Sequence, residues 1–96
     1  MDYYENIKKE LIELDIGLLI VNAGIYRPGD FTQINTDVQE SMLDANVYHV
    51  AAFVKKFLPG LIGRSKKFGL VTVSSAIGYM PSPFNTTYAA TKAFVN

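Results

Sequence analysis

The most apolar run of this 96-residue chain is Ile16-Gly17-Leu18-Leu19-Ile20-Val21. A continuous apolar run of this length is typical of a strand that is buried on both faces, as in parallel sheets. Residues 68–74 have the same character. The two runs therefore predict two strands of one parallel sheet.

Helical periodicity surrounds both runs. Residues 3–14 predict an amphipathic helix, and Thr36 is the predicted N-cap of a long helix in which Pro59 predicts a kink or a new turn. A last helix is predicted to start at Thr86 or Thr87. The order helix, strand, helix, strand, helix is typical of an α/β fold in which a helix connects neighbouring parallel strands.

A few polar residues point to a reaction. Tyr88 and Lys92 are four residues apart, so a helix presents them on one face. A free phenol, with a pKa near ~10, is a poor acid or base at neutral pH, and a nearby ammonium favours the phenolate. The pair is therefore a candidate acid/base, and Ser75 supplies a hydroxyl that could hold a carbonyl oxygen. This chemistry interconverts an alcohol and a ketone.

Each of these residues also has a purely structural interpretation. Tyr88 and Lys92 could be ordinary residues of an amphipathic helix, and Ser75 could end a strand or form a turn. Asn46 falls among apolar residues at helical spacing, where an amide costs stability unless its hydrogen bonds are satisfied. Taken jointly, the residues favour a functional site over a set of separate structural roles.

The residues around these positions match a known family. The sequence resembles the short-chain dehydrogenase/reductases from about residue 14 to its last residue, in four blocks that occur in the family's order. The blocks are Asp15-Ile16-Gly17-Leu18-Leu19-Ile20-Val21-Asn22-Ala23-Gly24, Asn46, Val73-Ser74-Ser75-Ala76-Ile77-Gly78 and Tyr88-Ala89-Ala90-Thr91-Lys92-Ala93-Phe94. Within the family, stretches such as Phe57-Leu58-Pro59-Gly60-Leu61-Ile62 are similar to 3-ketoacyl-CoA reductases and 17-beta-hydroxysteroid dehydrogenase type 12-like enzymes.

The resemblance implies a fold and an activity. The fold would be a partial Rossmann-like doubly wound parallel sheet, with residues 1–96 as the central part of a single NAD(P)-binding domain truncated at both ends. The activity would be NAD(P)(H)-dependent interconversion of a ketone and a secondary alcohol, with a 3-oxoacyl-CoA or a steroid or lipid carbonyl as substrate. The 96-residue chain alone is expected to be inactive. The alternative is a catalytically inactive truncated product that acts as a dimerisation or interaction module.

The resemblance also implies residue roles. Tyr88 would donate the proton to the substrate oxygen, while Lys92 would favour the phenolate and hydrogen-bond the cofactor ribose. Ser75 would orient the carbonyl, and Asn46 would hold a water that links the lysine to solvent. The segment 22–24 would lie beside the adenosine half of the cofactor. The expected cofactor-binding residues are Asn22, Ala23, Gly24, Tyr88 and Lys92.

The resemblance implies NADP or NAD as the cofactor, with NADPH favoured. The family's glycine-rich pyrophosphate turn is absent from this sequence, because none of its 7 glycines forms Gly-x-x-x-Gly-x-Gly or Gly-x-Gly-x-x-Gly. The expected partners are a small carbonyl or alcohol substrate and, by the same resemblance, a second copy in a homodimer. Nine basic residues balance nine acidic ones, so no nucleic-acid partner is expected.

No metal site is expected either. The chain has no cysteine, and its one histidine, His49, has no cluster of metal-ligating residues around it. Membrane attachment would come only from segments outside these residues, so the resemblance leaves the cytoplasm and the endoplasmic reticulum membrane open as locations.

Loop residues keep two interpretations. Tyr26 and Phe31 follow the first predicted strand and either pack on the surface or form a wall of the substrate entrance. Residues 64–67 are a basic stretch that forms a solvated turn or binds phosphate. In the loop before the last helix, Phe84 could touch the substrate.

Overall fold

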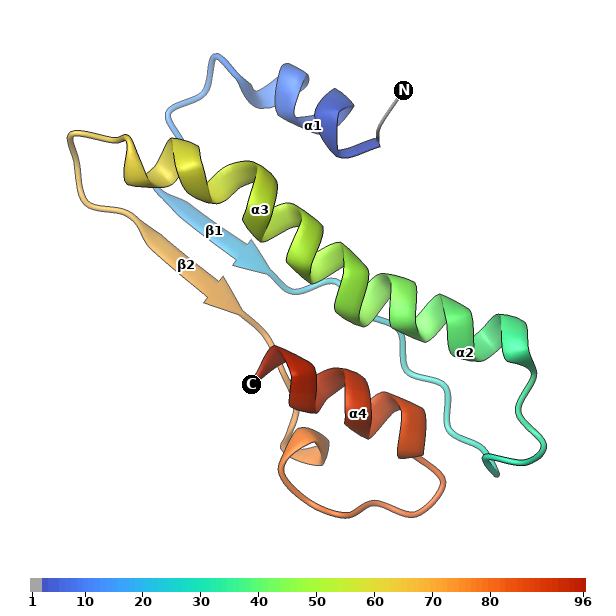
Figure 1. The fold of residues 1–96 in the computed structure, drawn as a ribbon. Helices are drawn as coiled ribbons and strands as arrows, with labels where there is room; N and C mark the ends of the chain where they lie inside the picture. Colours follow the sequence, from blue (N-terminus) through green and yellow to red (C-terminus); the bar gives the residue numbers. More distant parts are fainter. Residues whose placement is uncertain (1–2) are drawn as a thin grey trace.

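The computed structural model describes residues 3–96, which form an α/β arrangement around a small parallel sheet (Figure 1). In chain order the elements are helix α1 (Tyr3–Leu11), strand β1 (Leu18–Val21), helix α2 (Thr36–Leu43), a π-helical segment (Asp44–Tyr48), helix α3 (His49–Ile62), strand β2 (Gly69–Thr72), a 3-10 turn (Ala76–Gly78) and helix α4 (Thr86–Val95). Helix α2, the π-helical segment and α3 run on as one long helix in Figure 1.

The sheet confirms the predicted pair of parallel strands. β1 and β2 pair in parallel, with Leu18 opposite Gly69 and Val21 opposite Thr72. Both strands are shorter than the apolar runs that predicted them, because regular pairing covers only these four positions. A further backbone hydrogen bond, from Val73 N–H to Val21 O at 3.0 Å, keeps the chains together just past the strand ends.

The hydrophobic core lies between the sheet and the long helix. The buried apolar residues are Val21, Met42, Val50, Phe57 and Leu61. The opposite face of the sheet is open within residues 3–96, where Leu18 and Ile20 are 56% and 54% exposed. The apolar runs of the sequence therefore supply a sheet with one covered and one uncovered face.

Two predicted boundaries of the helices were wrong. Helix α1 ends at Leu11 rather than residue 14, because Leu14 N–H closes a turn onto Leu11 O at 2.9 Å and its side chain lies out in solvent. The residue that precedes α2 in an extended conformation is Asn35, not Thr36, and its carbonyl accepts the first hydrogen bonds from the helix. Thr36 is the first residue inside the helix.

The new turn predicted at Pro59 does not form. Helix α3 continues through Pro59 to Ile62, and the proline carbonyl accepts a hydrogen bond from Gly63 N–H at 3.0 Å. A proline removes one helical donor, and packing of Phe57 and Leu61 against the sheet offsets that loss. Within residues 3–96, every helix is too short or too polar to cross a lipid bilayer.

Candidate active site

The candidate site lies where the two strands end. Lys92 on α4 donates its Nζ to Val73 O at 3.3 Å, just after β2. Ser74 donates its hydroxyl back to Lys92 O at 2.8 Å. The last turn of α4 is therefore fixed against the segment that follows the carboxyl end of β2, which is where open α/β sheets bind ligands.

Lys92 is a buried cation beside Tyr88. Its side chain is only 6% exposed, and its Nζ lies 5.7 Å from the centre of the Tyr88 ring. No carboxylate of residues 3–96 forms an ion pair with it. An ammonium carries three donors, and Val73 O takes one of them. The remaining donors can bind a hydroxyl or another oxygen-bearing group in the site.

Asn46 is held in the π-helical segment, where His49 N–H bonds to Asp44 O five residues back. Such segments are frequent at functional sites. The Asn46 amide is 1% exposed, accepts from Ile25 N–H at 2.7 Å, and donates to Ile25 O at 2.8 Å and to Thr91 Oγ1 at 3.1 Å. Both amide hydrogens are used, so only its oxygen or nearby main-chain carbonyl groups remain for a water.

Gly24 lets the segment after β1 approach this group closely. A Cβ at this position would lie 3.0 Å from Asn46 Oδ1 and 3.4 Å from Lys92 Nζ. The structure therefore brings Gly24, Asn46 and Lys92 together, as sequence alone could not show. Asn22 and Ala23 are exposed at the end of β1, open to a ligand.

Ser75 lies in the segment that follows β2, and it is half-buried. Its Oγ accepts from Ile77 N–H at 3.3 Å and so caps the 3-10 turn. This bond uses a lone pair of Oγ and leaves the hydroxyl hydrogen for an outside acceptor such as a carbonyl oxygen. Gly78, in the same turn, packs directly on the backbone of Lys92.

Two further residues contact the site: Thr91, which was not predicted as a site residue, and Tyr26, which was predicted either to pack on the surface or to form a wall of the substrate entrance. Thr91 is 1% exposed and donates its hydroxyl to Tyr88 O at 2.7 Å while it accepts from Asn46. Tyr26 places its ring edge-on to Tyr88, with ring centres 4.8 Å apart and an interplanar angle of 74°. Thr91 and Ser74 each lie inside a quoted sequence block, but nothing in those blocks indicates their partners.

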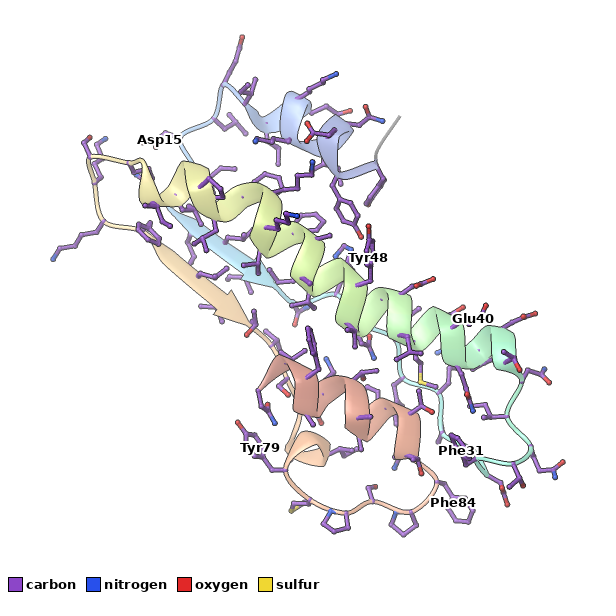
Figure 2. The ribbon with its side chains drawn as sticks, viewed as in Figure 1. Asp15, Phe31, Glu40, Tyr48, Tyr79 and Phe84 are labelled. Atoms are coloured by element: carbon purple, nitrogen blue, oxygen red, sulfur yellow. The ribbon has the colours of Figure 1, made fainter. Side chains whose placement is uncertain are left out.

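The loop after β1 and the loop before α4 meet beside the N-terminal end of α4. Gly29 N–H donates to Phe84 O at 2.8 Å, and Phe84 has a left-handed backbone with φ of 63°. Phe31 and Phe84 line one shallow pocket and lie at the same end of the molecule in Figure 2. Both side chains lie beside the start of α4 and are exposed, so surface packing and a wall of a substrate entrance both remain as interpretations.

A carboxylate on a loop near the site has a lowered pKa. Asp30, on the loop after β1, accepts hydrogen bonds from the Thr32 hydroxyl at 2.7 Å and from Thr32 N–H at 2.9 Å. These bonds favour the carboxylate and lower the pKa of Asp30, with the hydroxyl as the larger cause. The site thus combines a buried cation, a tyrosine and a serine hydroxyl at the end of a parallel sheet.

The sequence of this chain is similar to those of known proteins. The family model described as short chain dehydrogenase matches residues 1–96. The very-long-chain 3-oxoacyl-CoA reductase of Mus musculus is 38% identical over 99% of this chain and 31% of its own length. Hydroxysteroid dehydrogenase-like protein 1 of Gallus gallus is 35% identical over 97% of this chain and 28% of its own length. A Pongo abelii relative named inactive hydroxysteroid dehydrogenase-like protein 1 is 32% identical over 99% of this chain and 29% of its own.

Solved structures agree with these relatives. Serine dehydrogenase from Escherichia coli superposes with a TM-score of 0.86 and 26% identity, over 96% of this chain and 45% of its own. A short chain dehydrogenase/reductase from Burkholderia phymatum, in complex with NAD, gives 0.86 and 25% over 96% and 33%. ElxO with NADP bound gives 0.84 and 26% over 96% and 38%.

The chain spans 28–31% of the length of the curated relatives named above. The family match, by contrast, covers every residue of this chain, and the three relatives are 32–38% identical over nearly all of it. The parallel strands and the long helix between them agree with that match. The chain belongs to the short-chain dehydrogenase family.

Proposed function

We propose that this chain carries the proton-transfer centre of an NAD(P)(H)-dependent oxidoreductase that interconverts a ketone and a secondary alcohol. The observation that supports this most is the buried Lys92 ammonium, which has unused donors and lies beside Tyr88 at the carboxyl end of the sheet. A buried cation without a carboxylate partner is costly in a structure, and a ligand oxygen or a phenolate would offset that cost.

In the reducing direction, Tyr88 gives its hydroxyl proton to the substrate oxygen, and the resulting phenolate is stabilised by Lys92. In the oxidising direction the phenolate takes the proton back. Ser75 donates its free hydroxyl hydrogen to the same oxygen and holds the carbonyl in place. The nicotinamide group, when bound, supplies or accepts the hydride at the substrate carbon. We assign two roles to Asn46: it fixes this geometry, and its side-chain oxygen can accept a second hydrogen bond from a water near Lys92.

The residues present fit part of a nicotinamide cofactor. Lys92 has spare donors for ribose hydroxyl groups. Gly24 has no side chain and lies beside Lys92, and the preceding Asn22 and Ala23 are exposed, so the backbone of this segment is accessible to a ligand. A pyrophosphate needs backbone N–H groups of a glycine-rich turn, and these 96 residues contain no such motif. The assignment to NAD or NADP is supported by the solved relatives, which hold one or the other.

The substrate we propose is an apolar carbonyl compound of the acyl-thioester or steroid type. The Mus musculus relative is named as a very-long-chain 3-oxoacyl-CoA reductase. The loop beside the site carries exposed apolar side chains, among them Tyr79, Met80 and Phe84. Such a surface suits an apolar chain or ring better than a sugar.

The test replaces Tyr88 by phenylalanine in the full-length protein as the cell makes it, including any residues beyond these 96. NADPH consumption is followed with a long-chain 3-oxoacyl thioester and with a steroid ketone. The Tyr88→Phe variant should lose at least about 10²–10⁴-fold in kcat, the usual contribution of a general acid, and keep its affinity for NADPH. Lys92→Ala should lower both kcat and the affinity for NADPH. Tyr48→Phe is the matched control, since this tyrosine is 63% exposed and lies on the long helix. A Tyr88→Phe enzyme with most of its rate would exclude the assignment.

A second candidate is an inactive interaction module. It is favoured by the open face of the sheet, where Leu18, Ile20 and Val71 are 56%, 54% and 45% exposed. Exposed apolar patches of this kind bind other protein surfaces. The two candidates differ in one measurement, because a full-length protein that binds neither NADPH nor NADH, by calorimetry at pH 7, can only be the module.

A further inference from the structure

We propose that Tyr26 is a positioning residue that fixes the ring of Tyr88 for proton transfer; the inference rests on the proposed function. Its ring meets the Tyr88 ring edge to face, with centres 4.8 Å apart and planes at 74°. This is a favourable arrangement of two aromatic rings, and it stabilises the pair beyond the burial of the rings. The contact restricts the side-chain torsions that decide where the Tyr88 hydroxyl points.

Tyr88 needs such a contact because its hydroxyl has no hydrogen-bond partner among residues 3–96. The two groups that flank its ring are Tyr26 and the Lys92 ammonium, which lies 5.7 Å from the ring centre. A single ammonium at that distance attracts the ring face but does not set its tilt. We infer that the contact with the Tyr26 ring sets the tilt of the Tyr88 ring.

The backbone that presents Tyr26 is itself fixed. Asn46 holds both polar groups of the preceding residue, accepting from Ile25 N–H at 2.7 Å and donating to Ile25 O at 2.8 Å. Arg27 donates to Tyr26 O at 2.8 Å. Because Asn46 is 1% exposed, its two bonds to Ile25 are shielded from water, whereas the Arg27 bond is exposed. The backbone that carries Tyr26 is therefore fixed by the buried centre of the site, while Tyr26 itself is 46% exposed.

The same asparagine also fixes the backbone of Tyr88. Its amide donates to Thr91 Oγ1 at 3.1 Å, and that hydroxyl donates to Tyr88 O at 2.7 Å. Asn46 thus connects to both tyrosine backbones, and the ring contact connects the two side chains. A loss of the Tyr26 ring would leave Tyr88 anchored at its backbone and free at its hydroxyl.

This arrangement predicts a specific kinetic effect. A displacement of about 1 Å in a reacting group can cost on the order of 10²-fold in rate, so Tyr26→Leu should lower kcat by roughly 10- to 100-fold. The affinity for NADPH should stay within about twofold, because Lys92 and its bond to Val73 are unchanged. The Tyr26→Phe variant keeps the ring and should retain at least half of the wild-type kcat.

The experiment measures kcat, KM, the Kd for NADPH, and the solvent deuterium isotope effect on kcat for these variants in the full-length protein. The isotope effect should rise in Tyr26→Leu, because proton transfer then limits the rate; a loss of stability alone would not raise it. Tyr3→Leu is the matched control, since Tyr3 is 62% exposed and meets Tyr4 edge to face at 5.2 Å on α1, away from the site. Tyr26→His, which keeps a smaller aromatic ring, should give an intermediate kcat and replaces the leucine variant if that one does not fold.

Tyr88→Phe, assayed in parallel, separates the two proposals. An active Tyr88→Phe enzyme refutes the proposed function itself. An inactive Tyr88→Phe enzyme together with wild-type kcat in Tyr26→Leu overturns the inference and leaves the function intact. Equal losses in Tyr26→Phe and Tyr26→Leu would also overturn it, because the hydroxyl rather than the ring would then be responsible.

Discussion

The two ends of β1 are built in different ways. At its carboxyl end, chain segments that are far apart in sequence meet through buried polar contacts, centred on Asn46 and Lys92. At its amino end, helix α1 and the end of α3 line an open pocket of about 250 Å³, and charged side chains are among the residues that line it. Asp15 marks this end in Figure 2, opposite Phe31 and Phe84.

The difference concerns how each contact is fixed. A buried hydrogen bond with both partners desolvated tolerates little displacement, because an unsatisfied partner costs about 1–3 kcal/mol. The amino end relies on ion pairs such as Glu5 with Lys56 and Asp15 with Arg64, and exposed pairs contribute only about 0–1 kcal/mol each. We therefore expect the site end to be the more rigid of the two, and the α1 end to open first.

The largest effect should come from Asn46→Leu. The substitution leaves Ile25 N–H, Ile25 O and the Thr91 hydroxyl without their buried partner, so the free energy of unfolding should fall by about 3 kcal/mol or more. Urea denaturation of the full-length protein measures this loss. Asn35→Leu is the control, because Asn35 is exposed and its side chain makes no capping hydrogen bond. Equal losses in the two variants would remove the distinction between the ends.

The next effect compares one substitution at both ends. A Cβ on Gly78 would lie 2.9 Å from the Lys92 carbonyl carbon and 3.0 Å from its oxygen, so Gly78→Ala must displace backbone and should cost about 1–3 kcal/mol. Gly60, which lines the pocket at the amino end, has nothing within 4 Å of the same position. Gly60→Ala should stabilise α3 by about 0.5–1 kcal/mol.

Thermal midpoints of the two alanine variants should therefore move in opposite directions. A downward shift for Gly60→Ala as large as that for Gly78→Ala would show that the amino end is as tightly packed as the site. The prediction depends only on backbone space, so it does not involve the catalytic assignment.

The sequence predicted the elements of the site better than their connections. Apolar runs were enough to place both strands, and the spacing of Tyr88 and Lys92 was enough to place them on one helical face. The contact of Asn46 with Ile25 spans 21 positions, and that with Thr91 spans 45. Contacts over such distances depend on the assembled fold and leave no local pattern in the sequence.

The helix ends failed for a related reason. Leu14 continues the apolar spacing of the first helix, but it is 61% exposed and lies past the end of α1. Periodicity predicts which face of a helix is apolar, and only tertiary packing decides how far the helix extends. Thr36 likewise has the side chain of a good N-cap, yet the extended residue is Asn35. The contacts of Tyr26 with Tyr88 and of Thr91 with Asn46 were not predicted, because these partners lie in other segments of the chain.

A smaller effect is expected at the amino end. Arg64 donates to Ile16 O at 3.0 Å and pairs with Asp15, so Arg64→Ala should lower the free energy of unfolding by about 1 kcal/mol. Lys66→Ala is the control, since Lys66 is 74% exposed and stands 3.8 Å from the same carboxylate. Hydrogen exchange should show faster opening of α1 in the arginine variant, with α4 unchanged. Faster exchange in α4 would mean that the two ends are coupled.

The smallest effect concerns pH and the loop that borders the site. The two hydrogen bonds from Thr32 lower the pKa of Asp30, so its carboxylate contributes stability that is present above the unfolded value near ~3.9 and is lost as pH falls through the folded value. Thr32→Val removes the hydroxyl donor and keeps the backbone donor. The pKa of Asp30, measured by carbon-detected NMR titration, should rise in this variant and stay below the ordinary value.

This titration tests whether the rigid region at the carboxyl end of β1 includes the loop that carries Asp30. Asp30 follows Gly29, whose N–H donates to Phe84 O. Protonation of the Asp30 carboxyl should therefore loosen the contact between the two loops, while the hydrogen bonds of Asn46 stay intact. Amide signals of residues 29–34 should therefore shift along the acid titration, while those of Ile25 and Thr91 stay in place. An unchanged Asp30 pKa in Thr32→Val would mean that the hydroxyl bond is not formed in solution. Shifts at Ile25 in the same pH range would mean that the loop and the buried centre move together, and the rigid region would then extend to Phe84.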